Sequence, residues 1–98
     1  MQKLKKTYRK NGFNYVQVKR NEKAAIYKQI DPTTGHESYE VFMIKVTKPF
    51  TLKSKGKNPK VYNYPAMEKF PGNEDFGKIA WAYMTIETTT EKYKELSK

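Results

Sequence analysis

Two clusters of basic side chains carry the most evident chemistry of this chain. One lies in residues 1–12 and the other in residues 47–60, where five lysines occur without an acidic residue. Ammonium and guanidinium groups at this density attract phosphates, and nearby tyrosines can stack on unpaired bases. The residues predicted to bind nucleic acid are Lys5, Lys6, Arg9, Lys53, Lys55, Lys57, Tyr8 and Tyr62.

The basic charge is unevenly distributed. Residues 1–60 carry 15 Lys and Arg against four acidic residues, whereas residues 61–98 carry five Lys against six acidic residues. Only Arg9 and Arg20 are arginines, and lysine lacks the planar fork that reads guanine edges, so phosphate attraction should outweigh base reading. The alternative is a lysine-rich surface without a nucleic-acid partner, because 18 Lys against two Arg also fits an AT-rich coding sequence.

No arrangement of residues typical of an enzyme occurs in the chain. His36 is the only histidine and cysteine is absent, so neither a His/Cys metal site nor a catalytic triad can be assembled. Glu74 and Asp75 are adjacent, so their carboxylates diverge and are expected to cap backbone or meet solvent. Phosphate-binding and dinucleotide fingerprints are also absent. We therefore expect no catalytic residue, metal, cofactor or small-molecule substrate.

The composition is that of one small folded domain. The chain has 98 residues, of which 37% are hydrophobic and 14% aromatic, enough for one modest core. No apolar run approaches the roughly 20 residues of a membrane span, and the basic N-terminus lacks the apolar region of a secretory signal. The absence of cysteine fits a reducing compartment. These features predict a cytoplasmic protein without a membrane partner.

Residues 38–46 are predicted to form the central strand of an antiparallel sheet. Their side chains are mostly apolar on both alternating faces, which suits a strand covered on both sides. A buried helix is the alternative, but the run is short and rich in Val, Ile, Phe and Tyr, which favour the extended form.

Two further strands are predicted at residues 13–19 and 24–30. Between the second of these and the central strand, Asp31 can cap backbone amides, Pro32 presets a turn dihedral, and Gly35 supplies a positive φ. This segment is therefore expected to close a hairpin onto the central strand.

The basic clusters are expected to lie outside the sheet. Residues 1–12 are predicted as a basic N-terminal arm, in which a short helix would end at the Asn11-Gly12 pair. Residues 47–60 are predicted as an exposed basic loop of a single domain that spans residues 13–98. Residues 61–64 are predicted as a short edge strand.

The C-terminal third is expected to contain one more strand and a helix. Residues 78–84 fit either a helical stripe or an alternating strand, and the strand is favoured because helix-start signals follow at Thr85 and Thr88. The helix is expected to run to Leu96. The predicted fold class is α+β, a three- to four-stranded antiparallel sheet with a C-terminal helix packed on one face.

Three segments carry a resemblance to a group of proteins. These segments are Tyr39–Lys45, Phe70–Gly77 and Ala80–Tyr83, and with them the chain resembles small uncharacterised proteins of Bacteroidetes phages. The resemblance implies no particular activity.

The predicted order of elements carries a second resemblance. Three strands and a helix, with the Tyr83-Met-Thr85 junction, are similar to the arm-type DNA-binding domain of tyrosine integrases and its AP2-like relatives. Those domains lay a three-stranded sheet in the major groove. The chain departs from them in its long insertion before Lys78 and in its few arginines.

Together these features predict a non-enzymatic accessory protein, encoded by a phage and acting in the cytoplasm of a bacterial host cell. It would bind a host protein or assemble with itself. The alternative is low-specificity binding of DNA or RNA backbone through the lysine-rich arm and loop. The sequence leaves open which partner is bound and in what oligomeric state.

Overall fold

The structure, a computed structural model, describes residues 2–98. The chain forms two compact units, each described here by itself. The sheet unit comprises residues 5–44 and 71–98, and the ribbon unit comprises residues 45–70 together with the described N-terminal residues 2–4. Residues 45–70 form strands that pair with each other, whereas the sequence predicted an exposed loop for residues 47–60.

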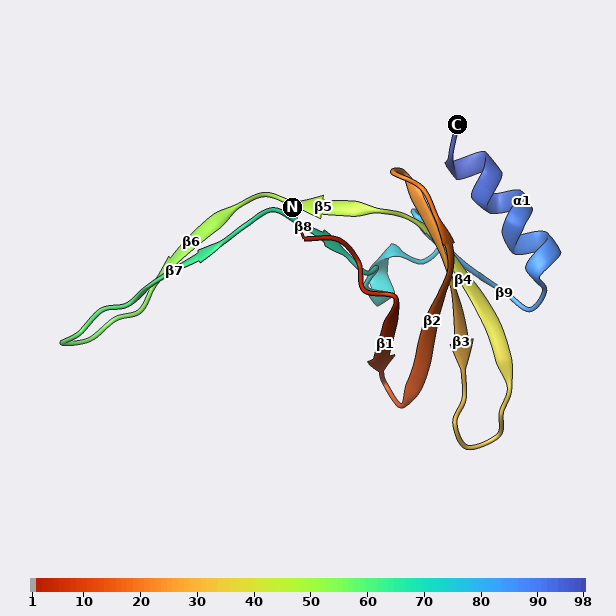
Figure 1. The fold of residues 1–98 in the computed structure, drawn as a ribbon, viewed down its shortest axis with the longest axis horizontal. Coiled ribbons are helices and arrows are strands. Elements are labelled where there is room, and N and C mark those ends of the chain that lie inside the picture. Colours follow the sequence, from red (N-terminus) through yellow and green to blue (C-terminus); the bar gives the residue numbers. More distant parts are fainter. Residues whose placement is uncertain (1) are drawn as a thin grey trace. The chain divides into compact units, whose positions relative to one another are not determined.

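The sheet unit contains a five-stranded antiparallel sheet with the strand order β1-β2-β3-β4-β9 (Figure 1). An α+β fold is thus confirmed, with one strand more than the three or four predicted. The strands are β1 Thr7–Lys10, β2 Phe13–Arg20, β3 Ala24–Ile30, β4 Glu37–Met43 and β9 Ala80–Tyr83.

The additional strand β1 lies inside the segment predicted as a basic arm with a short helix. Lys10 pairs with Phe13, and between them Asn11 and Gly12 have φ angles of 52° and 81°. Two consecutive positive φ angles are the geometry of a tight hairpin turn, for which Asn-Gly is the strongest sequence signal. The Asn-Gly pair therefore turns a strand back on β2, and the interpretation as a helix stop was wrong.

Strand β4 is an interior strand with β3 on one side and β9 on the other, although the middle strand of the five is β3 rather than β4. Val41 and Phe42 point to opposite faces of the sheet and both have no exposed surface, so both faces are covered. The strand ends at Met43 rather than at Val46. Ile44 leaves the sheet and donates its amide to the Lys23 carbonyl at 2.8 Å.

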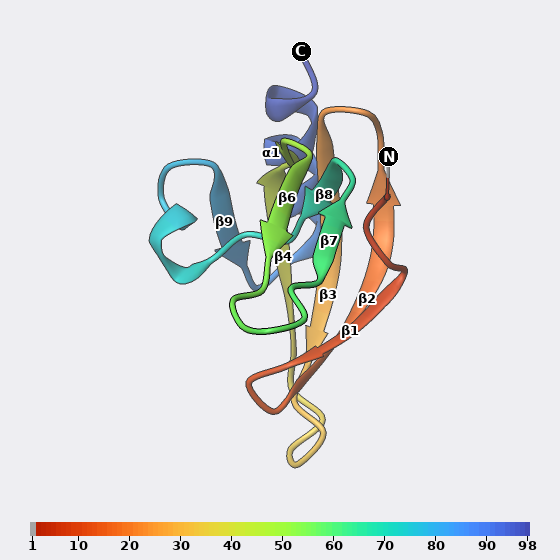
Figure 2. The same cartoon turned by 90° about the vertical axis from the view of Figure 1, so that its left-hand side faces the viewer.

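One face of the sheet is covered by α1, Ile86–Leu96 (Figures 1 and 2). Tyr93 of α1 is 5% exposed and packs with Ala24, Ile26 and Val41. The helix begins where Thr85 accepts a hydrogen bond from the Thr88 amide at 3.4 Å, so Thr85 is the N-cap. Residues 80–83 form β9, which confirms the strand predicted within 78–84.

Aromatic rings fill the opposite face of the sheet. Tyr27 stacks on Phe42, with ring centroids 5.7 Å apart, and also contacts the ring of Tyr8 at 5.8 Å. The Tyr27 hydroxyl donates a hydrogen bond to the Lys5 carbonyl at 2.6 Å. The hairpin formed by β1 and β2 is thereby fixed to the core.

The ribbon unit consists of paired strands within a segment that was partly predicted as a loop. Its strands are β5 Lys45–Thr47 with β8 Met67–Lys69, and β6 Phe50–Lys53 with β7 Val61–Tyr64. The bounds of β7 agree with the predicted edge strand, but β6 lies inside the predicted loop 47–60. Pro49 and Pro65 lie in the gaps between the paired segments, and neither has an N–H to donate, which explains the interruption.

The segment between β8 and β9 contains the short 3-10 helix η1, Asn73–Asp75. The Asp75 carboxylate accepts a hydrogen bond from the Gly72 amide at 2.9 Å, which is the capping role expected for this acidic pair. Within residues 2–98, no helix is long and apolar enough to cross a membrane.

Candidate functional site

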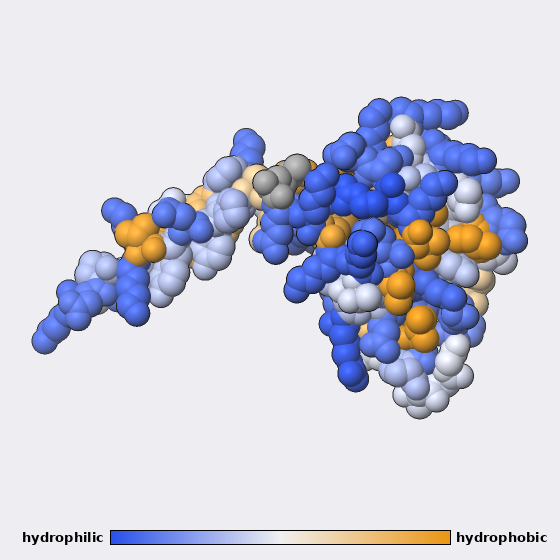
Figure 3. All heavy atoms as spheres, viewed as in Figure 1, coloured by the Kyte–Doolittle hydropathy of each residue, from blue (hydrophilic) through white to orange (hydrophobic). Residues whose placement is uncertain are grey.

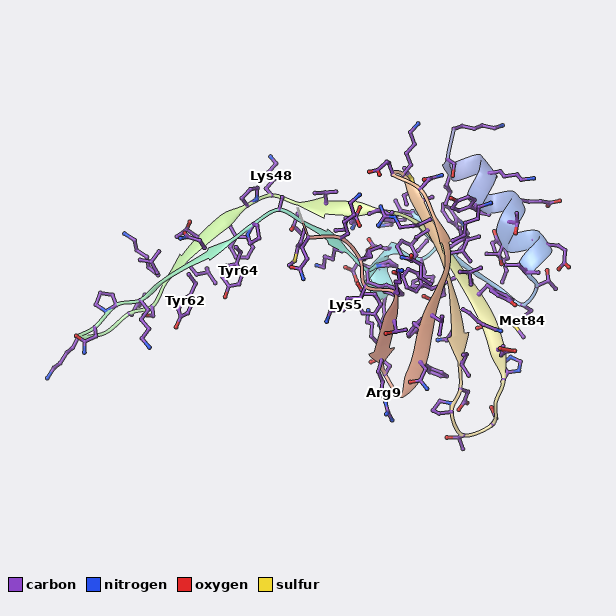
Figure 4. The ribbon with its side chains drawn as sticks, in the orientation of Figure 1. Lys5, Arg9, Lys48, Tyr62, Tyr64 and Met84 are labelled. Carbon is purple, nitrogen blue, oxygen red and sulfur yellow. The ribbon has the colours of Figure 1, made fainter. Side chains whose placement is uncertain are left out.

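The β6–β7 hairpin has one apolar and one mainly polar face. Phe50 pairs with Tyr64 and Leu52 with Tyr62, and because alternate residues share a face, these four side chains form one surface. We call it the aromatic face. Its side chains are 39% to 51% exposed. Figure 4 shows Tyr62 and Tyr64 pointing to the same side of the hairpin, and Lys48 pointing to the other.

The aromatic face is ordered by a contact across the two strands. The rings of Phe50 and Tyr64 are stacked, with centroids 4.7 Å apart and an interplanar angle of 14°. A shallow hollow is lined by these two residues together with Pro49, Thr51, Asn63 and Pro65, so it is not confined to the aromatic face. In Figure 3, a few apolar atoms in orange appear on this hairpin between hydrophilic side chains in blue, whereas tyrosine is hydrophilic on this scale and is not drawn in orange. Phe50 and Tyr64 are thus held in contact with each other while both stay exposed.

The hairpin is closed by polar contacts on its opposite face and toward its tip. The Thr51 hydroxyl lies 3.1 Å from the Asn63 side-chain oxygen, to which it donates a hydrogen bond. Toward the tip, the Ser54 amide donates to the Lys60 carbonyl at 2.8 Å, and the Lys60 amide donates to the Ser54 hydroxyl at 2.7 Å. The tip between them turns at Gly56, which has a φ of 133°.

Five exposed lysines lie along the hairpin and its ends, and no acidic residue occurs between Val46 and Met67. The acidic residue nearest along the chain, Glu68, is 7% exposed and accepts a hydrogen bond from the Leu4 amide at 2.9 Å. The lysine charge is therefore not neutralised within the hairpin. The five residues are Lys48, Lys53, Lys55, Lys57 and Lys60.

The predicted nucleic-acid-binding residues are distributed over both units. Lys53, Lys55, Lys57 and Tyr62 come together in the β6–β7 hairpin and its tip, whereas Lys5, Lys6, Arg9 and Tyr8 belong to the sheet unit.

The second group is altered by the pairing of β1. Lys5, Lys6 and Arg9 remain exposed, but Tyr8 is partly buried. Its ring packs on Tyr27, and its hydroxyl accepts a hydrogen bond from the Lys5 amide at 2.8 Å. The Tyr8 ring is thus packed within the sheet unit, whereas the rings of the aromatic face are exposed.

Sequence reasoning missed Phe50 and Leu52 as site residues. The signal was present as the alternation of Phe50 and Leu52 on one side of the lysine-rich tip and of Tyr62 and Tyr64 on the other. Prolines and lysines around Phe50 hid this period-two pattern, so the segment was interpreted as a loop.

A buried acidic residue in the sheet unit was also missed. Glu40 on β4 is 7% exposed, and one of its carboxylate oxygens, Oε2, has no hydrogen-bond partner. Burial raises the pKa of Glu40, against the opposing effects of the Lys10 charge and a hydrogen bond from Tyr15. Burial and the Glu40 charge likewise raise the pKa of Tyr15.

A chain of hydrogen bonds leads away from Glu40 and Tyr15. Gln29 donates to the Tyr15 hydroxyl at 2.8 Å, and Ser38 donates to the Gln29 side-chain oxygen at 2.9 Å. The group lies across three neighbouring strands. In the described part of the chain, no cluster of three or more His, Cys, Asp or Glu side chains could hold a metal ion.

Comparisons of the chain with protein-family models, with curated proteins and with solved structures found no match. The resemblances to phage proteins and to integrase arm domains therefore stay predictions, and the function is inferred from the surface of the protein.

Proposed function

We propose that the protein is a non-enzymatic binding protein whose ribbon unit binds the phosphate backbone of nucleic acid with low sequence specificity. The observation that carries this proposal is the set of five exposed lysines around the β6–β7 hairpin, in a stretch without acidic residues. Such a surface attracts polyanions by releasing their counterions.

The charge balance of the ribbon strands supports this proposal. Residues 45–70 carry seven Lys against one Glu, a balance of +6 out of the +10 of the whole chain. The single acid, Glu68, is buried and engaged with the Leu4 amide. All of the cations are lysines, which act as point charges on phosphates and give little base discrimination.

A protein partner is the second candidate function. The aromatic face favours it, because tyrosine and phenylalanine are enriched in protein interfaces. A host protein would need an acidic rim to match the lysines. Self-assembly through two aromatic faces is less favourable, since it would bring two sets of lysines together. Self-assembly would more readily use the sheet edges at β1 and β9.

The proposal is tested by fluorescence anisotropy with labelled 30-nucleotide DNA, single-stranded and duplex, between 50 and 200 mM salt. If five lysines contact phosphates, log affinity should fall against log salt with a slope of roughly −3.5 for single strands and −4.5 for duplex. No binding at 50 mM salt, or affinity that does not change with salt, would refute the proposal.

Charge reversal locates the interface. The triple variant Lys53→Glu, Lys55→Glu and Lys57→Glu should abolish binding. A matched control reverses Lys78, Lys94 and Lys98, three exposed lysines of the sheet unit, and changes the net charge equally. The control should lose much less affinity. Equal losses would show that total charge, rather than the ribbon, governs binding. Pull-down from nuclease-treated host lysate then distinguishes a protein partner.

A further inference from the structure

We infer that the ribbon unit prefers single-stranded nucleic acid over duplex, because unpaired bases stack on its aromatic face. This inference rests on the proposed function and specifies its ligand. The supporting feature is the combination of half-exposed rings and unneutralised lysines on one hairpin.

The spacing of the rings suits bases. Tyr62 and Tyr64 are two residues apart on one strand, so their attachment points are separated by roughly 6.8 Å. This is about twice the 3.4 Å spacing of stacked bases along a nucleic-acid strand. The two tyrosines therefore offer two separate rings along one strand, one for each of two bases.

The stacking of Phe50 on Tyr64 fixes the orientation of the Tyr64 ring. Phe50 covers one side of the Tyr64 ring at 4.7 Å and holds it in place, while Tyr64 is still 39% exposed. A base arriving on the exposed side meets a ring that is already oriented, so little side-chain entropy is lost on binding.

Lysines lie where the phosphates of a bound strand would run. Lys60 is two residues before Tyr62 and, by the alternation of strand residues, is expected on the same side as the aromatic face. Lys53 follows Leu52 directly and can reach around the edge of the narrow two-stranded hairpin. Stacking and phosphate contacts can therefore form simultaneously, the combination typical of single-strand binding.

The same hairpin is poorly equipped to read a duplex. A duplex hides the flat surfaces of its bases and displays base edges, which are read mainly by Arg, Asn and Gln. Residues 45–70 contain no arginine or glutamine, and of their two asparagines Asn58 lies in the tip, while the side-chain oxygen of Asn63 already accepts a hydrogen bond from Thr51 on the opposite face. A second copy of the chain is disfavoured because it would bring the same lysines with no acid to meet them.

The test compares the affinities of a 20-nucleotide thymidine strand and a 20-base-pair duplex at 100 mM salt. The wild-type protein should bind the single strand at least tenfold more tightly. In the variant Tyr62→Leu/Tyr64→Leu, which keeps charge and apolar character, each ring lost should cost roughly 5- to 150-fold in single-strand affinity. Duplex affinity should change little.

Two further variants test whether a loss of binding comes from the missing hydroxyls or from loss of hairpin structure rather than from the missing rings. Tyr62→Phe/Tyr64→Phe keeps the rings and should retain single-strand affinity, which excludes a role of the hydroxyls. Asn63→Leu changes the same strand on its opposite face and should leave the preference intact. If Asn63→Leu weakens single-strand binding as much as the leucine pair does, loss of hairpin structure is the cause and the stacking inference fails.

The outcomes separate this inference from the proposed function. Salt-dependent binding that is equal for both nucleic acids and unaffected by the leucine variant would overturn the inference and leave the proposed function standing. Absence of binding to either one would overturn both. A dimer in light scattering that dissociates in the leucine variant, without change in nucleic-acid affinity, would assign the aromatic face to a second copy.

Discussion

The rings of Phe50 and Tyr64 stack across β6 and β7 at 4.7 Å, in a hairpin whose strand residues are all exposed. An isolated two-stranded hairpin is marginally stable in water, so cross-strand pairs of this kind decide whether it is ordered. The same two rings that order the hairpin are also part of its exposed aromatic face.

Removal of one ring should therefore loosen the hairpin. We expect Phe50→Ala to lower the local stability of β6–β7 by about 1 kcal/mol. Amide hydrogen exchange should become faster at Leu52 and Tyr62 and stay unchanged in β3 and β4. Thr51→Ala, on the opposite face, is the matched control and should have a smaller effect. Equal exchange in wild type and Phe50→Ala would show that the pair does not order the hairpin.

The buried carboxylate of Glu40 should make the stability of the sheet unit depend on pH. Its pKa in the folded protein is raised above the ordinary value of 4.5, so the protonated form is favoured by folding. The resulting contribution to stability is full below pH 4.5 and is lost as the pH rises through the raised pKa.

Glu40→Gln should consequently increase stability at pH 7, by about 1 kcal/mol, because an amide carries no charge to desolvate. Urea unfolding of both proteins at pH 7 and pH 4 measures this difference, which should shrink at pH 4. A variant that is less stable at pH 7 would mean that the ionised carboxylate has a stabilising partner.

The turn between β1 and β2 depends on its positive φ angles. Gly12 has a φ of 81° and open space around its α-carbon, so a side chain there meets backbone strain rather than a clash. Gly12→Ala should cost about 1 kcal/mol and increase amide exchange in β1. Gly35→Ala, in the turn before β4 with a φ of 77°, is a matched comparison that should spare β1.

The first turn of α1 depends on Thr85. Thr85→Ala should destabilise the protein by about 1 kcal/mol, measured by urea unfolding, because the Thr88 amide loses its acceptor. Thr88→Ala should cost less, since its side chain does not cap the helix. A larger loss in Thr88→Ala than in Thr85→Ala would place the functional cap one turn later.

Local patterns in the sequence determined the strands at 13–20, 24–30 and 37–43, the turn at Asp31 and the start of the helix at Thr85. In each case, a period-two alternation, a turn residue or a cap acts within a few neighbouring residues. The two lysine clusters are also evident from the sequence alone.

Only the tertiary structure decided which segments pair with each other and which polar side chains are buried. Whether Asn11-Gly12 ends a helix or turns a strand depends on the pairing of β1 with β2, and the aromatic face exists only because residues 50–53 pair with residues 61–64. Glu40 is buried because neighbouring strands lie on both sides of β4. Nothing in the residues next to it in the sequence distinguishes it from a solvent-exposed strand residue. Pairing between distant segments and burial depend on the whole chain, so local patterns do not encode them.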